Sequence, residues 1–481
     1  MTRQLPIVFA LAIAVSAMPA AQAPDRSKPP ASGAAPALKL PAIQKRQLSN
    51  GMPVWLVELH EVPVVQVNLL VQGGTADDPA GKFGIGSLMA AMLTEGAGSR
   101  SSLDIADAID FLGADLSAAA AVNATSIRLH VPVARVADAL PIMADVAQRP
   151  TFPAAELERL RQQRLTSLLQ ARDDPSTTAA LAFSRVLYGG DHRFGTATMG
   201  TAGTIKGFTV QDLQSFYNAT VRPETSTLVV AGDITLDKAM PLLEASFGKW
   251  KPASPAPKRP SLTNPGQPVT RVVYLVDKPN APQSQIRIGW IGVARSTPDY
   301  FPLTVLNTVL GGSFTSRLNN NLREVHGYAY GAGSGFDMRG EPGPFFATAG
   351  VQTDKTSEAL KEFFIELTAI QKPVPADELA RAKNYVALRY PSAFESTGDI
   401  SRRLEDMLIY RLPEDYFTKY VQNIQAVTAA DVERVAQKYV QPGKFTVVVV
   451  GDLKTIETGV RGMNLGQVKV MTIDEVFGPK P

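Results

Sequence analysis

The chain has 481 residues, of which 45% are hydrophobic, so it is too long for one ordinary core and has enough apolar material for about two to four domains. Its 48 Lys and Arg residues against 45 Asp and Glu residues leave a formal net charge of +3 without a block of like charges, which argues against a surface for nucleic acid or an anionic membrane. The sequence has no cysteine, which excludes disulfides, thiolate metal sites and an acylated N-terminal cysteine.

Residues 1–23 are typical of a signal peptide for export. One cation, Arg3, precedes an apolar run over residues 5–17, and small residues follow up to Ala23. The run is short for a bilayer span, and no later segment approaches the roughly 20 apolar residues that a transmembrane helix needs. We therefore expect an exported protein, periplasmic or secreted, that does not span the membrane. Pro24 disfavours cleavage directly after Ala23, so the cleavage site stays open, and an uncleaved anchor is the alternative.

Two stretches rich in proline and small residues divide the chain. Residues 24–42 are predicted to form a tail after the signal peptide, and residues 251–268 a semi-rigid linker, because such a composition cannot supply a packed core. They leave an N-terminal domain at 43–250 and a C-terminal domain at 269–481.

Strands and helices alternate irregularly along the first half, which favours an α+β class over a doubly wound parallel sheet. Apolar and β-branched patterns predict strands at 52–59, 64–74 and 126–133. Helical periodicity predicts helices at 84–94, 103–112, 135–147 and 154–171.

The ends of the two halves repeat each other. Residues 208–234 align without a gap on residues 427–453, each residue matching the one 219 positions later. In both copies a Thr with Asp three residues on is a plausible N-cap for a short amphipathic helix, and a proline precedes a strand buried on both faces. Two homologous domains are therefore predicted; two unrelated domains with a common ending are the alternative. The identical pairs are Thr209/Thr428, Asp212/Asp431, Pro223/Pro442, Thr227/Thr446, Val229/Val448, Val230/Val449, Gly232/Gly451 and Asp233/Asp452.

Several local motifs carry a family resemblance. They are SNGMPVWLVE at 49–58, the QGG strand end at 72–74 before an acidic turn, GIGSLMAAMLTEGA at 84–97, and RPETSTLVVAGD at 222–233. From Leu48 to Leu453 the chain resembles the inverted-zincin peptidases, the family of pitrilysin, insulin-degrading enzyme and the mitochondrial processing peptidases. The resemblance implies two homologous α/β-roll domains, each a mixed, mainly antiparallel sheet with helices packed on one face.

Active members of that family carry H-x-x-E-H on the helix that corresponds to residues 84–94. Two histidines at i and i+4 hold Zn²⁺, and the Glu beside the second one is the general base. Here these positions are Ser87, Ala90 and Ala91, which supply no suitable donor. The family's third ligand, a Glu, would fall within residues 166–168, where no carboxylate stands. We therefore expect no metal and no other cofactor in this chain.

No other catalytic apparatus is evident in the sequence. It has no Walker loop, G-x-S-x-G elbow or cysteine nucleophile. The glycine-rich segments 311–318 and 331–343 lack phosphate-loop spacing and are predicted to be turns between elements. The histidines have no metal spacing, and for each a surface or hydrogen-bonded role is expected; they are His60, His130, His192 and His326.

The second half keeps one family signature, because LGGSFTSRL at 310–318 and LREVHGYAY at 322–330 resemble L-G-G-x-x-S-R-L…L-R-E-x-x-G-x-x-Y. The resemblance assigns Arg323 and Tyr330 to the pair that reaches the substrate near the zinc. A guanidinium and a phenol can donate hydrogen bonds to the oxygen that gains negative charge during peptide hydrolysis. Without the resemblance, a solvated ion pair of Arg323 with Glu324 and half-buried packing of Tyr330 are the ordinary interpretations.

The resemblance implies a non-catalytic subunit of a heterodimeric zinc peptidase. A homologous partner with H-x-x-E-H would hold the zinc and the general base, and Arg323 and Tyr330 would act on an unfolded peptide from this chain. No nucleic-acid or membrane partner is expected. The alternatives are a structural or peptide-holding protein without a proteolytic role, and an independent hydrolase with an unrecognised site.

Overall fold

The computed structural model describes residues 41–252, 262 and 265–481. The predicted signal peptide at 1–23, nearly all of the tail at 24–42 and most of the linker at 251–268 lie outside the described residues, so these predictions and the domain boundaries stay untested. No helix within the described ranges is both long and apolar enough to cross a membrane.

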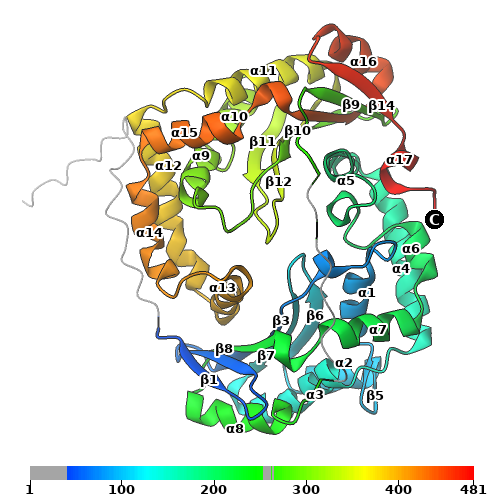
Figure 1. Cartoon of the computed structure of the whole chain (residues 1–481), viewed down its shortest axis with the longest axis vertical. Coiled ribbons are helices and arrows are strands. Elements are labelled where there is room, and N and C mark those ends of the chain that lie inside the picture. The colour runs from blue at the N-terminus through cyan, green and yellow to red at the C-terminus, as the bar shows by residue number, and fades with distance from the viewer. Residues whose placement is uncertain (1–40, 253–261, 263–264) are drawn as a thin grey trace, which may run out of the picture. The chain divides into compact units, whose positions relative to one another are not determined.

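The first half contains a six-stranded mixed sheet whose strands lie in the order β1-β2-β8-β3-β7-β6 (Figure 1). Only β2 and β8 pair in parallel; the other neighbours are antiparallel. The central strands β3 and β8 are buried over nearly their whole length, as their β-branched runs predict. The strands are β1 (Gln44–Gln47), β2 (Pro53–Glu58), β3 (Val64–Val71), β6 (Asp115–Ala120), β7 (Thr125–Pro132) and β8 (Ser226–Gly232).

The second half contains another six-stranded sheet, ordered β11-β12-β10-β13-β9-β14. Five of its strands repeat the first sheet, because β9, β13, β10, β12 and β11 follow the order of β2, β8, β3, β7 and β6. The predicted α+β class with mixed, mainly antiparallel sheets is thus confirmed. The strands are β9 (Val272–Asp277), β10 (Gln283–Ile291), β11 (Ala329–Phe336), β12 (Pro344–Gln352), β13 (Thr446–Gly451) and β14 (Gln467–Met471).

Helices cover one face of each sheet with an apolar core. On the first sheet the core includes α1 (Ile85–Met92), α2 (Ser102–Phe111), α3 (Val136–Gln148), α4 (Ala154–Asp173), α6 (Ala202–Gly207), α7 (Val210–Thr220) and α8 (Leu236–Phe247). On the second it includes α9 (Tyr300–Leu310), α10 (Arg317–Asn319), α11 (Thr356–Ala369), α12 (Ala376–Arg389), α14 (Tyr416–Ala426), α15 (Ala429–Tyr439) and α16 (Leu453–Gly462).

The predicted N-caps are confirmed. Thr209 accepts a hydrogen bond from the backbone N–H of Asp212, whose carboxylate accepts one from the N–H of Thr209. The same reciprocal pair joins Thr428 and Asp431 ahead of α15. Both helices therefore begin where the sequence repeat places them.

The second face of each sheet is covered by a helix from the other half. Helix α5 (Pro175–Tyr188) packs through Phe183 and its neighbours on β10 and β13. Helix α13 (Thr397–Tyr410) packs through Leu404 and its neighbours on β3 and β8. Because each half covers apolar surface of the other, the two halves are joined by shared cores and not only by the linker.

Strand β6 and part of the glycine-rich segment 331–343 depart from the sequence predictions for a physical reason. Strand β6 was not predicted, because Asp-Leu-Ser-Ala-Ala-Ala is rich in residues with low strand propensity; it forms by pairing with β7. The glycine-rich segment 331–343 was predicted as a turn, but residues up to Phe336 continue β11. The prediction was wrong for this part, since pairing with β12 decides the structure where local propensity is weak.

Candidate functional site

Helix α1 carries the three positions of the missing motif. Its start is fixed by Gly84, which has a φ of +102°. A Cβ there would lie 2.3 Å from the carbonyl oxygen of Met199, so only glycine fits. Ser87 and Ala91 are half-buried and Ala90 is buried, so the helix presents methyl groups and one hydroxyl at these places.

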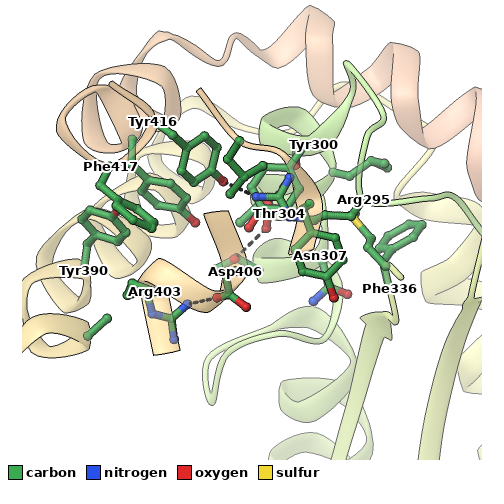
Figure 2. Close-up of a pocket in the computed structure, with 17 residues that line it drawn as sticks. Arg295, Tyr300, Thr304, Asn307, Phe336, Tyr390, Arg403, Asp406, Tyr416 and Phe417 are labelled. Carbon is green, nitrogen blue, oxygen red and sulfur yellow. Dashed lines mark hydrogen bonds and ion pairs between the residues drawn. The ribbon is translucent and has the colours of Figure 1, made fainter. Parts of the chain in front are cut away.

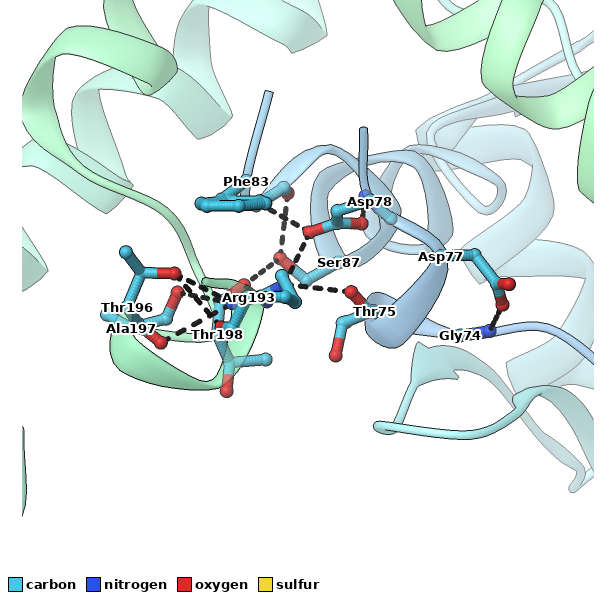
Figure 3. Close-up of polar contacts among 12 residues, drawn as sticks. Gly74, Thr75, Asp77, Asp78, Phe83, Ser87, Arg193, Thr196, Ala197 and Thr198 are labelled. Atoms are coloured by element: carbon cyan, nitrogen blue, oxygen red, sulfur yellow. Dashed lines mark hydrogen bonds and ion pairs between the residues drawn. The ribbon is translucent and has the colours of Figure 1, made fainter. Parts of the chain in front are cut away.

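A buried ion pair holds the N-terminus of α1 (Figure 3). The carboxylate of Asp78 accepts hydrogen bonds from the backbone N–H groups of Gly84 and Gly86 at 2.7 and 2.9 Å. Nε of Arg193 lies 2.9 Å from the same carboxylate and donates to the carbonyl oxygen of Thr75 at 2.8 Å. Burial raises the pKa of Asp78, and the Arg193 guanidinium opposes that rise. The acidic turn of the family resemblance is therefore structural in this chain.

The guanidinium of Arg164 lies against the motif position Ser87. Nη1 of Arg164, on α4, donates to Oγ of Ser87 at 2.8 Å. The Ser87 hydroxyl is within donating distance of the carbonyl oxygens of Gly84 and Thr198, at 3.0 and 3.1 Å. Burial lowers the pKa of Arg164 to about 10, and the charge of Asp78 opposes that lowering. With a pKa of about 10, the arginine is still positively charged at neutral pH.

The residues at this place do not fit a zinc ion. Ser87 is engaged by Arg164, the methyl groups of Ala90 and Ala91 have no lone pair, and a fixed cation repels a second one. On α4, where the third ligand was sought, Thr166 is exposed and Leu168 is buried in the core. Within the described ranges, no three or more His, Cys, Asp or Glu side chains gather so that they could hold a metal ion.

The histidines lie in separate local settings. His60 is exposed between Asp233 and Glu58, and hydrogen bonds to these carboxylates raise its pKa. His192 stacks on Tyr188 and accepts from a backbone N–H. His326 stacks on Tyr328, and His130 is exposed on β7.

Arg323 lies in an irregular helical turn in the second half. The turn Asn320–Val325 is π-helical, with the N–H of His326 donating to the carbonyl oxygen of Asn321 at 3.1 Å. Such turns are rare and often mark functional sites. The preceding signature arginine, Arg317, is structural, because it forms a two-pronged ion pair with Glu378 at 2.8 and 2.6 Å.

Tyr330 lies at a β-bulge on the edge strand β11. The register against β12 shifts by one residue between Ala329 and Ala332, so Tyr330 falls in the irregular part. Bulges of this kind turn a side chain away from the sheet and are frequent next to active sites. Tyr330 is accordingly 85% exposed, far more than half-buried packing would allow.

The structure brings Arg323 and Tyr330 together with a third side chain, Phe314. The Arg323 guanidinium lies 5.0 Å from the ring centre of Tyr330 and 4.7 Å from that of Phe314, which is itself 61% exposed. Nε of Arg323 also lies 3.2 Å from Glu324. Arginine on aromatic rings is a favourable arrangement that restricts the guanidinium. In the described part of the chain, no hydrogen bond, ion pair or ring contact joins this group to α1.

Two of these residues were missed in the sequence. Phe314 stands inside the recognised LGGSFTSRL signature, so its position gave a signal that could have been used. Arg164 is one of several arginines on α4, and nothing in the local pattern distinguishes the one that faces α1.

A separate cavity of about 440 Å³ lies in the second half between α9, α13 and α14 (Figure 2). Its walls are rich in tyrosine and phenylalanine. Its charged groups are engaged with their neighbours: the Arg295 guanidinium lies 3.6 Å from the ring centre of Tyr300, and Nη1 of Arg403 donates to Asp406 at 3.0 Å. This cavity is not formed by any of the predicted site residues.

Two protein-family models match the chain, one after the other. The model described as insulinase (peptidase family M16) matches residues 54–189, and the model described as peptidase M16 inactive domain matches residues 207–386. Together the two matches span more than half of the chain.

Similar proteins and solved structures carry the names of zinc proteases or of peptidase family M16. An uncharacterised zinc protease of Mycobacterium leprae is 29% identical over 324 residues, which cover 66% of this chain and 72% of the relative. One of Streptomyces coelicolor is 24% identical over 416 residues, covering 86% and 90%. The crystal structure of a peptidase M16 inactive domain from Pseudomonas fluorescens matches with a TM-score of 0.78 and 27% identity, covering 85% of this chain and 98% of that one.

Proposed function

Because this chain belongs to the M16 family of peptidases but has no metal-binding donors at Ser87, Ala90 and Ala91, we propose that it is the non-catalytic subunit of a heterodimeric zinc peptidase. A homologous partner would supply the zinc ion and the general base. This chain would contribute the side chains of Arg323 and Tyr330. The observation that carries the proposal is that Arg164 contacts the motif position Ser87 on α1, while in the second half a half-buried Arg323 stacks on the exposed ring of Tyr330.

The chemistry of the pair suits contacts to a peptide undergoing hydrolysis. The carbonyl oxygen of the scissile bond gains negative charge in the transition state. The phenol of Tyr330 can donate one hydrogen bond to that oxygen, and the Arg323 guanidinium can donate to it or to a neighbouring carbonyl. In the described residues the pair does not contact α1. We therefore propose that the zinc ion and the general base with which it acts lie on a partner subunit.

The peptide would bind in an extended form, and an edge strand beside α1 supports this. Strand β6 is the last strand of its sheet, and α1 packs against it. Residues 117–120 of this strand are Ser or Ala and half of the strand's residues are exposed, so a peptide could add to its outer edge by backbone hydrogen bonds. We propose that this chain holds unfolded peptide in this way. The signal peptide predicted at residues 1–23 supports a periplasmic or secreted location for the complex.

The proposal is tested by mixing this chain with a homologous subunit that carries H-x-x-E-H and measuring cleavage of an unfolded peptide. Addition of this chain should raise kcat/KM at least about tenfold, and Arg323→Ala or Tyr330→Phe should remove most of that gain, because transition-state hydrogen bonds are typically of that size or larger. Arg381→Ala removes an exposed arginine of α12 and serves as the control that leaves the gain unchanged. A partner that cleaves equally fast alone, or pair variants without effect, would contradict the shared site and favour a peptide-holding role.

A further inference from the structure

A groove of about 520 Å³ begins beside the Arg323–Tyr330 pair. It lies over β10, β11 and β12 and reaches Ser176 at the start of α5. Phe314 is part of its wall and also stacks on Arg323, so the groove and the pair share one side chain. Gly331, the neighbour of Tyr330, forms part of its floor.

The floor is open because its residues are small. Gly331, Ala332 and Gly333 of β11 and Ala349 and Gly350 of β12 have no side chain beyond Cβ. Longer side chains at these places would fill the groove. The space is therefore a property of the sequence of two neighbouring strands, and it lies next to Arg323 and Tyr330, which we propose act on the peptide.

Arg287, in the middle of β10, is the one charged residue among those that line the groove within the described chain. Its side chain is half-buried, and burial lowers its pKa. The guanidinium lies 5.0 Å from the ring centre of Phe346. Across the sheet it faces Thr348 and Val448, which are uncharged. In the described residues no carboxylate pairs with it and no hydrogen bond satisfies it.

A partly desolvated cation without a counter-ion is unfavourable for folding, and stacking on one ring offsets only part of that cost. An anion on a bound ligand would supply the counter-ion that Arg287 lacks. A carboxylate suits a guanidinium best, because both are planar and form two parallel hydrogen bonds. Peptides carry carboxylates on Asp, on Glu and at the C-terminus.

Resting on the proposed function, we propose that this groove binds a carboxylate of the peptide on which Arg323 and Tyr330 act, and that Arg287 is its counter-ion. The complex would then prefer substrates with an acidic side chain or a free C-terminus a few residues from the scissile bond. The small residues of β11 and β12 leave room for the chain that carries the carboxylate.

The test measures fluorescence anisotropy of short labelled peptides on the isolated chain. Four peptides share one sequence and differ in a central Glu or Gln and in a free or amidated C-terminus. The variants are wild type, Arg287→Gln and, as a matched control, Arg271→Gln, which removes another half-buried arginine stacked on a phenylalanine. Circular dichroism melting curves establish that each variant is folded.

The wild-type chain should bind the carboxylate-bearing peptide about tenfold more tightly than its neutral counterpart, as a charge-assisted pair allows. Arg287→Gln should abolish this preference while leaving the neutral peptide within about twofold, and Arg271→Gln should preserve it. The peptide that shows the preference identifies the side-chain or the terminal carboxylate as the source. Equal weakening for all four peptides, no preference in wild type, or no binding would overturn the proposal.

The outcome is separable from that of the proposed function, because no partner is present in the assay. A carboxylate preference in a chain that does not stimulate a partner would support the groove and contradict the shared site. Stimulation of a partner by a chain that shows no carboxylate preference would support the shared site and contradict the groove.

Discussion

Nη1 of Arg164 donates a hydrogen bond of 2.8 Å to Oγ of Ser87, so a guanidinium from α4 contacts the first position of the missing zinc motif. The motif positions therefore differ from a zinc site by more than their missing donor atoms. A positive charge is now built into the packing of α1 against α4, and it is held there by the surrounding core.

Restoring the motif alone should not restore metal binding. The triple variant Ser87→His, Ala90→Glu, Ala91→His keeps Arg164, whose charge disfavours Zn²⁺ at this place. Adding Arg164→Glu replaces that charge by a carboxylate, and zinc affinity should rise by about tenfold or more. Zinc retained after dialysis, measured by mass spectrometry, checks this. Equal zinc content with and without the Arg164 change would contradict the role given to that residue.

A buried carboxylate should contribute strongly to the joining of the two halves. Glu405 of α13 is 3% exposed and accepts hydrogen bonds from Asn68, Ser126 and Arg128 of the first half at 2.9, 3.1 and 2.9 Å. Glu405→Ala leaves these donors without their acceptor, and the free energy of unfolding should fall by about 2–4 kcal/mol.

Glu414 provides the matched control, because it also crosses between the halves, through an ion pair with Lys45, but its side chain is 82% exposed. Exposed pairs contribute little. Glu414→Ala should therefore change urea unfolding much less than Glu405→Ala does. Similar losses for the two variants would show that burial does not govern this contact.

Phe314 should act as a positioning residue for Arg323. Phe314→Ala removes one of the two rings that flank the guanidinium, and kcat of the mixed enzyme should fall by several-fold while the melting temperature stays unchanged, because the ring is largely exposed. Phe314→Tyr keeps the ring and should keep the rate. A rate loss in both variants, or in neither, would exclude this role.

Acid should weaken the native state through His192. Its Nδ1 accepts from the backbone N–H of Phe194 at 3.0 Å, which only a neutral ring can do. Burial lowers the pKa of His192, and the charge of Arg339 lowers it further. Below the unfolded-state pKa of about 6.5 the unfolded chain binds a proton that the native ring does not, so stability is lost as pH falls from that value.

His192→Asn offers an acceptor of similar position without a titrating group. Urea unfolding at pH 7 and at pH 5.5 should show a smaller loss of stability on acidification for this variant than for the wild-type chain. An equal loss in both chains would mean that other groups cause the acid sensitivity.

The α+β class and the repeat could be predicted from the sequence, because each rests on local patterns. Thr209 and Thr428 mark their helix starts through contacts three residues away. By contrast, the partners of α5 and α13 could not be predicted, since an amphipathic pattern shows that a face is apolar but not which sheet it covers. The π-helical turn at Arg323 and the bulge at Tyr330 depend on tertiary contacts, so the stacking of Arg323 on the exposed Tyr330 could not be predicted from local patterns either.

The proposal that the zinc and the general base lie on a partner subunit is tested most directly by measuring zinc content and peptide hydrolysis of the isolated chain in one preparation. We predict no stoichiometric zinc and no chelator-sensitive hydrolysis until a subunit with H-x-x-E-H is added. Zinc bound at one equivalent near Ser87, together with turnover by the chain alone, would contradict the account.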